Sequence, residues 1–167
     1  MLTENSIPWK RRVKEILIDY LFILMYLLIL FGASMGFFFG ILGYIPAFSE
    51  LQMQLIAALA SVLPIILIFS FLDYKKGSIG KRKAKLKLYY KHKSIKASLF
   101  RNILKFLPWQ LAHIGVIHGT YTNFGLSSIV FANASIVMAL IMLIMGLARK
   151  DKRHFGDLIA GTQVQAM

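Results

Sequence analysis

The basic residues of this chain are confined to three clusters, and long uncharged apolar stretches separate them. All 20 Lys and Arg residues fall within residues 10–14, 75–105 and 149–153. Residues 20–49, 51–72 and 106–148 contain no Asp, Glu, Lys or Arg. A bilayer core of roughly 30 Å is crossed by about 20 apolar residues in helical form. The uncharged stretches are long enough for this, so we expect an all-α membrane protein.

Composition narrows the class further. The chain is 57% hydrophobic and 16% charged, whereas an ordinary soluble domain is roughly 25% charged. A net charge of +13 fits nucleic-acid binding in a soluble protein. Here the charge flanks apolar stretches, so we expect contact with anionic lipid headgroups and no nucleic-acid partner. The absence of cysteine excludes disulfides, thiolate metal sites and Cys nucleophiles.

Four transmembrane helices are predicted, at about residues 16–40, 51–72, 99–118 and 126–147. The first apolar run is longer than the core of a signal peptide, so it is expected to remain as a membrane helix. The segment 99–118 is the most polar of the four, and it either crosses the membrane or lies in the interface. If it crosses, all Lys and Arg lie on one side, because the loops at 41–50 and 119–125 contain neither. We therefore predict a four-helix transmembrane bundle.

The positive-inside rule gives the orientation of this bundle. Both termini, the basic segment 73–98 and the tail 148–167 are expected in the cytoplasm, with the whole chain forming one domain. From Lys83 to Tyr90, basic and less polar residues alternate with period two, which predicts a half-buried strand. Residues 91–94 would then form the turn of a small β-hairpin, which needs the membrane or the bundle behind it to be stable.

Two ionisable residues lie in the first predicted helix. A carboxylate such as Asp19 costs about 2.5–3.5 kcal/mol at the centre of a bilayer, and it usually faces a partner or a water-filled cavity. Arg12 shares its helix face but lies about 10 Å away along the axis, so each residue is expected to pair with another helix. Asp19 therefore forms either a structural interhelical ion pair or a binding site for a proton or cation.

His113 is the second unusual residue, because it falls inside the third predicted span. It shares a helix face with Trp109, four residues earlier. It is either a hydrogen-bonded structural residue or part of a proton relay. A metal site with His118 is disfavoured by their five-residue spacing, and neither a metal nor another cofactor is expected.

Four glycines recur at intervals of three or four residues near the end of the first helix: Gly32, Gly36, Gly40 and Gly43. Small residues on one face let helices pack closely in lipid. Such glycines also make a helix end flexible, so both interpretations stay open.

The C-terminal tail carries an acid, Asp157, between glycines, and we expect it to pair with Arg12 or Arg101. Arg12 followed by Asp19 after seven residues, together with the segment 156–162, resembles the pattern of the RDD family. These are small bacterial membrane proteins named for one Arg and two Asp. Gly80-Lys81 and Arg101-Asn102 also resemble family positions, whereas the lysines at 83, 85 and 87 depart from the usual apolar strand. The resemblance implies a bacterial cytoplasmic membrane and a suggested transport role, with cation/proton antiport attributed to some members.

Two functions follow from these observations. The favoured one is transport of a cation or proton by a homo-oligomer, with the site formed by Arg12, Asp19, Arg101, Asp157 and His113. The alternative is a non-catalytic scaffold or accessory subunit that binds anionic lipid or a partner protein through its basic cytoplasmic face. No nucleophile–base pair, phosphate-binding glycine loop or paired carboxylates are visible in the sequence, so an enzyme is not expected.

Overall fold

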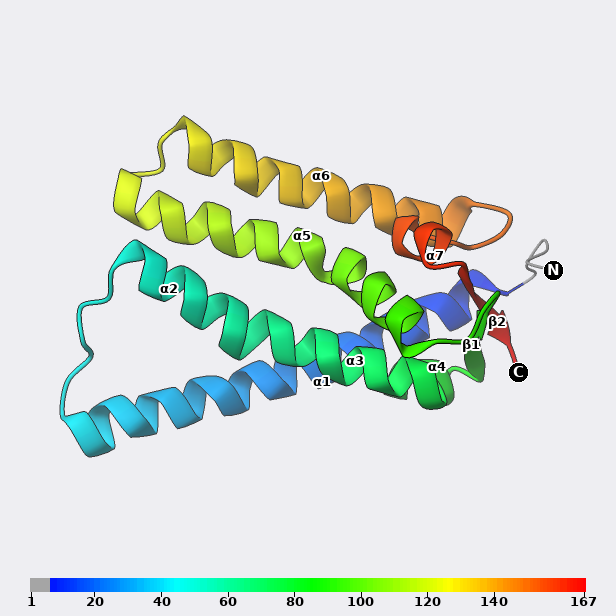
Figure 1. Cartoon of the computed structure of the whole chain (residues 1–167), viewed down its shortest axis with the longest axis horizontal. Helices are drawn as coiled ribbons and strands as arrows, with labels where there is room; N and C mark the ends of the chain where they lie inside the picture. Colours follow the sequence, from blue (N-terminus) through cyan, green and yellow to red (C-terminus); the bar gives the residue numbers. More distant parts are fainter. Residues whose placement is uncertain (1–6) are drawn as a thin grey trace.

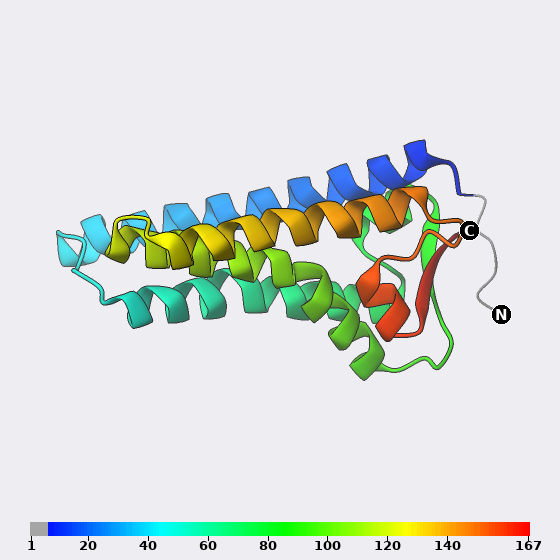
Figure 2. The same cartoon turned by 90° about the horizontal axis from the view of Figure 1, so that it is seen from above.

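Four long helical rods run side by side in the computed structural model, which describes residues 7–167 (Figure 1, Figure 2). The first rod is α1 (Trp9–Phe37), continued by a π-helical stretch, η1 (Phe38–Leu42). The second consists of α2 (Glu50–Ile56), the π-helical stretch η2 (Ala57–Val62) and α3 (Leu63–Lys75). The third and fourth are α5 (Ile95–Thr122) and α6 (Leu126–Ala148).

The short elements gather at one end of the rods, beside the start of α1 and the C-terminus (Figure 1). They are α4 (Ile79–Lys83), β1 (Leu86–Tyr90), α7 (Phe155–Ile159) and β2 (Thr162–Ala166). The three clusters of Lys and Arg lie in or next to these elements. We call this end of the molecule the basic end, and the end that carries the α1–α2 and α5–α6 loops the opposite end.

Three of the rods are long and apolar enough to cross a membrane: Trp9–Leu42, Glu50–Lys75 and Leu126–Ala148. α5 is not among them, because charged residues occupy its first three turns and polar residues such as Gln110, His113 and His118 follow. It nevertheless runs alongside α6 over most of its length in both views (Figure 1, Figure 2). The expected helix at 99–118 therefore forms, and it extends in both directions.

Local sequence signals account for where the rods begin and bend. Ser49 caps α2 by accepting a hydrogen bond from the backbone N–H of Gln52 at 3.3 Å, and the Gln52 side chain accepts from the Ser49 N–H at 2.8 Å. Ser94 caps α5 in the same way, at 3.0 Å from the N–H of Ala97. Pro64 follows the wider turns of η2, which accommodate a residue without a backbone N–H.

The main hydrophobic core lies between α1, α3 and α5, toward the basic end. Phe69 is at its centre, with its ring edge-on to Phe22 at 6.1 Å and to Phe106 at 5.3 Å between centroids. A smaller cluster under the strands consists of Ile7, Ala84, Leu86 and Val164. Most large apolar side chains of α1 and α6 face outward, as lipid-facing side chains do.

The predicted strand forms, but the predicted hairpin is wrong. β1 pairs antiparallel with β2 of the C-terminal tail, with Leu86 opposite Ala166 and Tyr90 opposite Thr162. Residues 91–94 lead directly into α5 instead of turning back. The distant pairing buries Leu86 and Val164 completely, whereas the residues that would form the second strand of a hairpin begin an amphipathic helix.

Gly32, Gly36 and Gly40 do not mediate helix packing within residues 7–167. A Cβ atom built on any of them would meet no heavy atom within 4 Å. The tightest approach is at Gly80 of α4, where a Cβ would lie 2.2 Å from the Glu15 carbonyl oxygen and 2.6 Å from Oδ1 of Asp19. Contact between α1 and α4 therefore requires glycine at this position.

Replacing Gly80 with Ala is expected to destabilise the protein, because α4 must move away from α1. Overpacking of a close contact costs about 1–3 kcal/mol. Thermal unfolding of the purified protein in detergent measures the effect. Gly32→Ala is the matched control, since the same methyl group enters open space there and should leave the unfolding temperature unchanged or slightly raised, because alanine favours a helix over glycine. Equal unfolding temperatures for both variants would contradict the described α1–α4 contact.

Candidate functional site

Buried charged side chains form a continuous set at the basic end. Four are acids and four are bases: Glu15, Asp19, Asp73, Asp157, Arg12, Lys81, Arg101 and Lys105. Ion pairs join six of them, and the Ser78 hydroxyl, hydrogen-bonded to Asp19 and Lys81, connects the Asp19–Lys105 pair to the rest. We call this set the charge network. All of its members except Lys105 are buried. Because acids and bases are equal in number, the network has no net formal charge.

Arg101 of α5 occupies the centre of the network. Its Nη1 donates to Oδ2 of Asp73 on α3 at 2.7 Å, and its Nε donates to Oδ1 of Asp157 on α7 at 2.6 Å. A guanidinium presents several donors in a fixed plane, so it can bind two carboxylates at once. Arg101 therefore joins three helices that are distant in sequence.

Two residues that flank α7, His154 and Thr162, complete the surroundings of Asp157. The Thr162 hydroxyl donates to Oδ1 of Asp157 at 2.8 Å. Burial alone would raise the pKa of Asp157, but the Arg101 guanidinium holds it well below its usual range. Burial, helped by nearby Arg101, lowers the pKa of His154 to about 3. The neutral ring accepts from Nη2 of Arg101 at 3.2 Å, since arginine can only donate.

Lys81 joins α4 to the two neighbouring rods. Its Nζ lies 2.9 Å from Oδ1 of Asp73 and 3.3 Å from Oε1 of Glu15. Burial works to lower the pKa of Lys81, but the two carboxylates outweigh it and the pKa is raised. Lys81 therefore stays charged although its side chain is fully buried.

Asp19 has its partners on another element, as the sequence predicted. Its Oδ2 accepts from the Ser78 hydroxyl at 2.7 Å, and its Oδ1 accepts from the Gly80 N–H at 2.8 Å. Lys105 of α5 approaches Oδ2 at 4.0 Å. Asp19 thus holds the start of α4 against α1 through both carboxylate oxygens.

The prediction for Arg12 is wrong, because its ion-pair partner lies on the same helix. Nη1 of Arg12 donates to Oε2 of Glu15 at 2.6 Å, one turn further along α1. Neighbours three residues apart on a helix are well placed to pair. The other end of the guanidinium lies near Gly146 of α6, where a Cβ would be 3.6 Å from Nη2.

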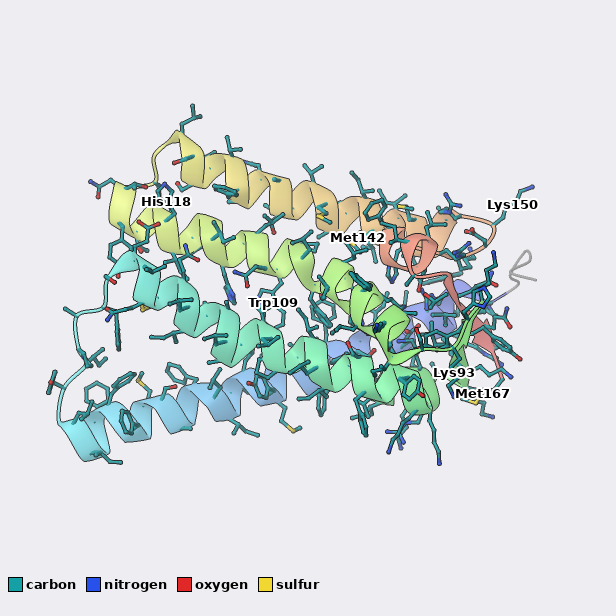
Figure 3. The ribbon with its side chains drawn as sticks, viewed as in Figure 1. Lys93, Trp109, His118, Met142, Lys150 and Met167 are labelled. Atoms are coloured by element: carbon teal, nitrogen blue, oxygen red, sulfur yellow. The ribbon has the colours of Figure 1, made fainter. Side chains whose placement is uncertain are left out.

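The structure thus brings together four of the five predicted site residues: Arg12, Asp19, Arg101 and Asp157. Of the two predicted partners of Asp157, Arg12 and Arg101, the structure shows Arg101. His113 is separate, about 18 Å along α5 from Arg101 by helical rise. Its Nε2 accepts from Nε1 of Trp109 at 3.1 Å, and Trp109 lies near the middle of the bundle (Figure 3).

Sequence reasoning missed four members of the network: Glu15, Asp73, Lys81 and Lys105. A signal was available in the composition. The chain has only 7 acids against 20 Lys and Arg, and an acid beside an apolar stretch needs a basic partner when it is buried.

The fold and the charge network define a helical membrane protein whose short elements at the basic end are fixed to the rods by buried ion pairs. The chain belongs to the RDD family, whose model matches residues 8–161. This confirms the family resemblance. Comparisons with curated proteins and with solved structures give no match.

Asp73→Asn is expected to destabilise the basic end strongly. The substitution leaves Lys81 and Arg101 buried with one anion fewer, and breaking a buried ion pair in this way costs about 3–5 kcal/mol. Unfolding by heat or denaturant in detergent measures the loss. Asp151→Asn is the control, because Asp151 pairs with the exposed Arg149 and such surface pairs contribute little. If both variants unfold like the wild type, the charge network is not a stabilising element.

Proposed function

We propose that this protein is a non-catalytic membrane scaffold or accessory subunit that binds anionic phospholipid headgroups through its basic end. The observation that carries the proposal is the contrast between two groups of basic residues. Those in the charge network are neutralised by carboxylates, and all but Lys105 are buried. Those outside it are largely exposed and gathered on the same end of the molecule.

The exposed group is large enough to dominate binding. Four of the 20 Lys and Arg belong to the charge network, which leaves sixteen outside it. Thirteen of these are exposed: Lys10, Arg11, Lys14, Lys75, Lys76, Arg82, Lys83, Lys85, Lys91, Lys93, Lys96, Arg149 and Lys150. Each basic residue near an anionic leaflet contributes about 1 kcal/mol of attraction. A surface of this kind favours anionic lipid over zwitterionic lipid.

The surroundings of Asp19 favour an anchoring role over a transport role for this residue. Both of its oxygens accept hydrogen bonds from the start of α4. Neither of the two described cavities, of about 640 Å³ and 280 Å³, is lined by Asp19 or His113. A transport site must exchange its ion with water on both sides of the membrane, whereas both Asp19 oxygens are engaged by the start of α4.

Transport of a cation or proton is the second candidate, and one observation favours it. Within residues 7–167, Nδ1 of His113 and Oε1 of Gln54 are buried without a hydrogen-bond partner. Gln54 also donates to the carbonyl of Ile114, the residue after His113, at 3.3 Å. Buried polar atoms at membrane depth need a partner, a water or an ion. Such a pair of atoms is what a proton pathway would use.

Flux measurements separate the two candidates. In proteoliposomes carrying a pH-sensitive dye, we expect the wild type to move no protons in response to Na⁺, K⁺ or Li⁺ gradients. Asp19→Asn and His113→Gln should then match the wild type. Wild-type flux that is abolished by either substitution, in protein that remains folded, would overturn the scaffold function and establish transport.

The proposal includes a topology of four membrane crossings with both ends of the chain in the cytoplasm of a bacterium. α5 returns the chain to the opposite end, where the α5–α6 loop lies at the same end as the α1–α2 loop (Figure 1). Its basic first turns carry Arg101 and Lys105 into the charge network. The Lys and Arg distribution then puts the basic end inside.

Single cysteines test this topology, because the natural chain has none. Tyr44→Cys and Thr120→Cys should react with a membrane-impermeant maleimide in intact cells. Lys93→Cys and Lys150→Cys should react only after permeabilisation. Labelling of Tyr44→Cys without Thr120→Cys would show that α5 does not cross, and labelling of Lys150→Cys in intact cells would reverse the assigned position of the tail.

A further inference from the structure

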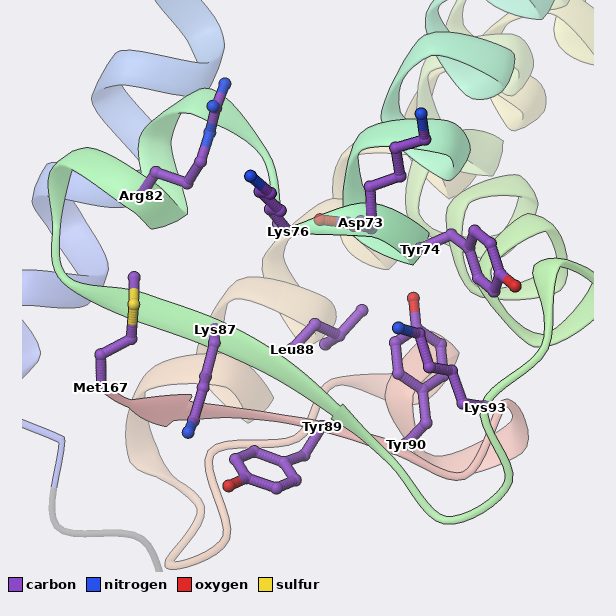
Figure 4. A pocket seen from close by; sticks show the side chains of 12 residues that line it. Asp73, Tyr74, Lys76, Arg82, Lys87, Leu88, Tyr89, Tyr90, Lys93 and Met167 are labelled. Carbon is purple, nitrogen blue, oxygen red and sulfur yellow. The ribbon is translucent and has the colours of Figure 1, made fainter.

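A concave site of about 640 Å³ opens at the basic end, outside the charge network (Figure 4). The end of α3, the turn that follows it, α4 and β1 form its walls, with the C-terminal Met167 also in the lining. The volume falls within the range of about 300–1,000 Å³ that small-molecule sites occupy. We call it the basic pocket.

Five basic side chains line the basic pocket: Lys75, Lys76, Arg82, Lys87 and Lys93. In the part of the chain that the structure describes, none of the five forms an ion pair with a carboxylate. Asp73 is the one acid in the lining, and its oxygens are already engaged by Lys81 and Arg101. The pocket therefore presents uncompensated positive charge in a concave surface.

Aromatic rings hold three of these ammonium groups without neutralising them. Nζ of Lys87 lies 4.6 Å from the ring centroid of Tyr89, and Nζ of Lys93 lies 5.3 Å from that of Tyr74. Lys75 lies 4.4 Å over Phe71, one turn earlier on α3. Such contacts contribute about 0.5–1 kcal/mol each at exposed sites. They reduce the entropy that the lysines would lose on binding an anion.

The backbone around the pocket is fixed before any ligand binds. Gly77 has a φ of +89°, which favours glycine, and its N–H donates to the carbonyl of Leu72 at 2.8 Å. The next residue, Ser78, donates its N–H to Asp73 at 3.0 Å. On the other side, β1 is held in register by β2. The turn and the strand thus set the spacing between the basic side chains of the two walls.

We propose that the basic pocket binds an anion with two or more phosphate groups, such as the headgroup of a polyanionic phospholipid. The inference rests on the proposed function. It assigns the recognition of a particular headgroup to the basic pocket. Several phosphate oxygens are needed to satisfy five cations, which a single carboxylate cannot do. The pocket begins where the apolar part of α3 ends, with Phe71 exposed beside Lys75, so a headgroup can enter from the membrane surface.

The test compares two triple variants that remove equal charge from the basic end. Lys76→Gln/Arg82→Gln/Lys87→Gln changes the pocket. Lys10→Gln/Arg11→Gln/Lys14→Gln changes exposed bases at the start of α1, outside the pocket lining. Binding of diphosphatidylglycerol, phosphatidylglycerol and phosphatidylcholine to the full chain in detergent is measured by native mass spectrometry, with inorganic pyrophosphate as the soluble probe. Thermal unfolding checks the fold, and Lys76→Gln alone replaces the triple variant if that variant unfolds.

We expect the wild type to prefer diphosphatidylglycerol and the pocket variant to lose at least about tenfold in its affinity, given about 1 kcal/mol for each basic residue. The control variant should retain most of that affinity. If pyrophosphate binds as tightly as the lipid, and only when the pocket is intact, the pocket is still a phosphate site. Its ligand is then a soluble phosphate compound and not a lipid headgroup. Equal losses in both variants would overturn the pocket while leaving general lipid binding. No preference for anionic lipid in the wild type would overturn the proposed function as well.

Discussion

The buried guanidinium of Arg101 is the interaction on which the arrangement of the basic end depends. Removing such a charge from water costs several kcal/mol, and only well-placed partners offset that cost. Asp73 and Asp157 provide them at 2.7 Å and 2.6 Å. Because Asp157 lies in α7, its contact with Arg101 also positions the tail that follows. β2 can then reach β1, so an ion pair within the bundle sets the position of a sheet outside it.

Asp19 and Gly80 fix the other side of the same end. The Asp19 carboxylate holds the first residues of α4, and the absence of a side chain at Gly80 lets α4 lie directly on α1. Lys81 then points into the charge network, while Arg82, the next residue, lines the basic pocket. Adjacent residues of one short helix therefore have opposite roles, and the contact between α4 and α1 decides which lysine or arginine is neutralised.

The sequence predicted the parts of this molecule that depend on local pattern. The long uncharged apolar stretches predicted the rods, and the alternation of polarity from Lys83 to Tyr90 predicted β1. Both patterns depend only on residues that are close together in the sequence. The partner of β1 was not predicted, since pairing with β2 joins segments more than seventy residues apart and depends on burial of Leu86 with Val164. The network was predicted only in part for the same reason. Glu15 and Lys81 form an ion pair only because α4 packs on α1. The sequence around either residue does not indicate that the other is its partner.

Pairing within the network also explains where an anion can bind. The fields of equal and opposite buried charges largely cancel beyond a few ångströms, and the remaining interactions at the surface are screened over about 8–10 Å at physiological salt. An approaching anion therefore responds to the unpaired bases nearby rather than to the total of +13. Asp73 lies at the boundary between the two regions, because it lines the basic pocket while its charge is offset by Lys81 and Arg101. Without these two bases, the Asp73 carboxylate would repel a phosphate in the pocket. Because Lys81 and Arg101 offset its charge, the pocket keeps its attraction for anions.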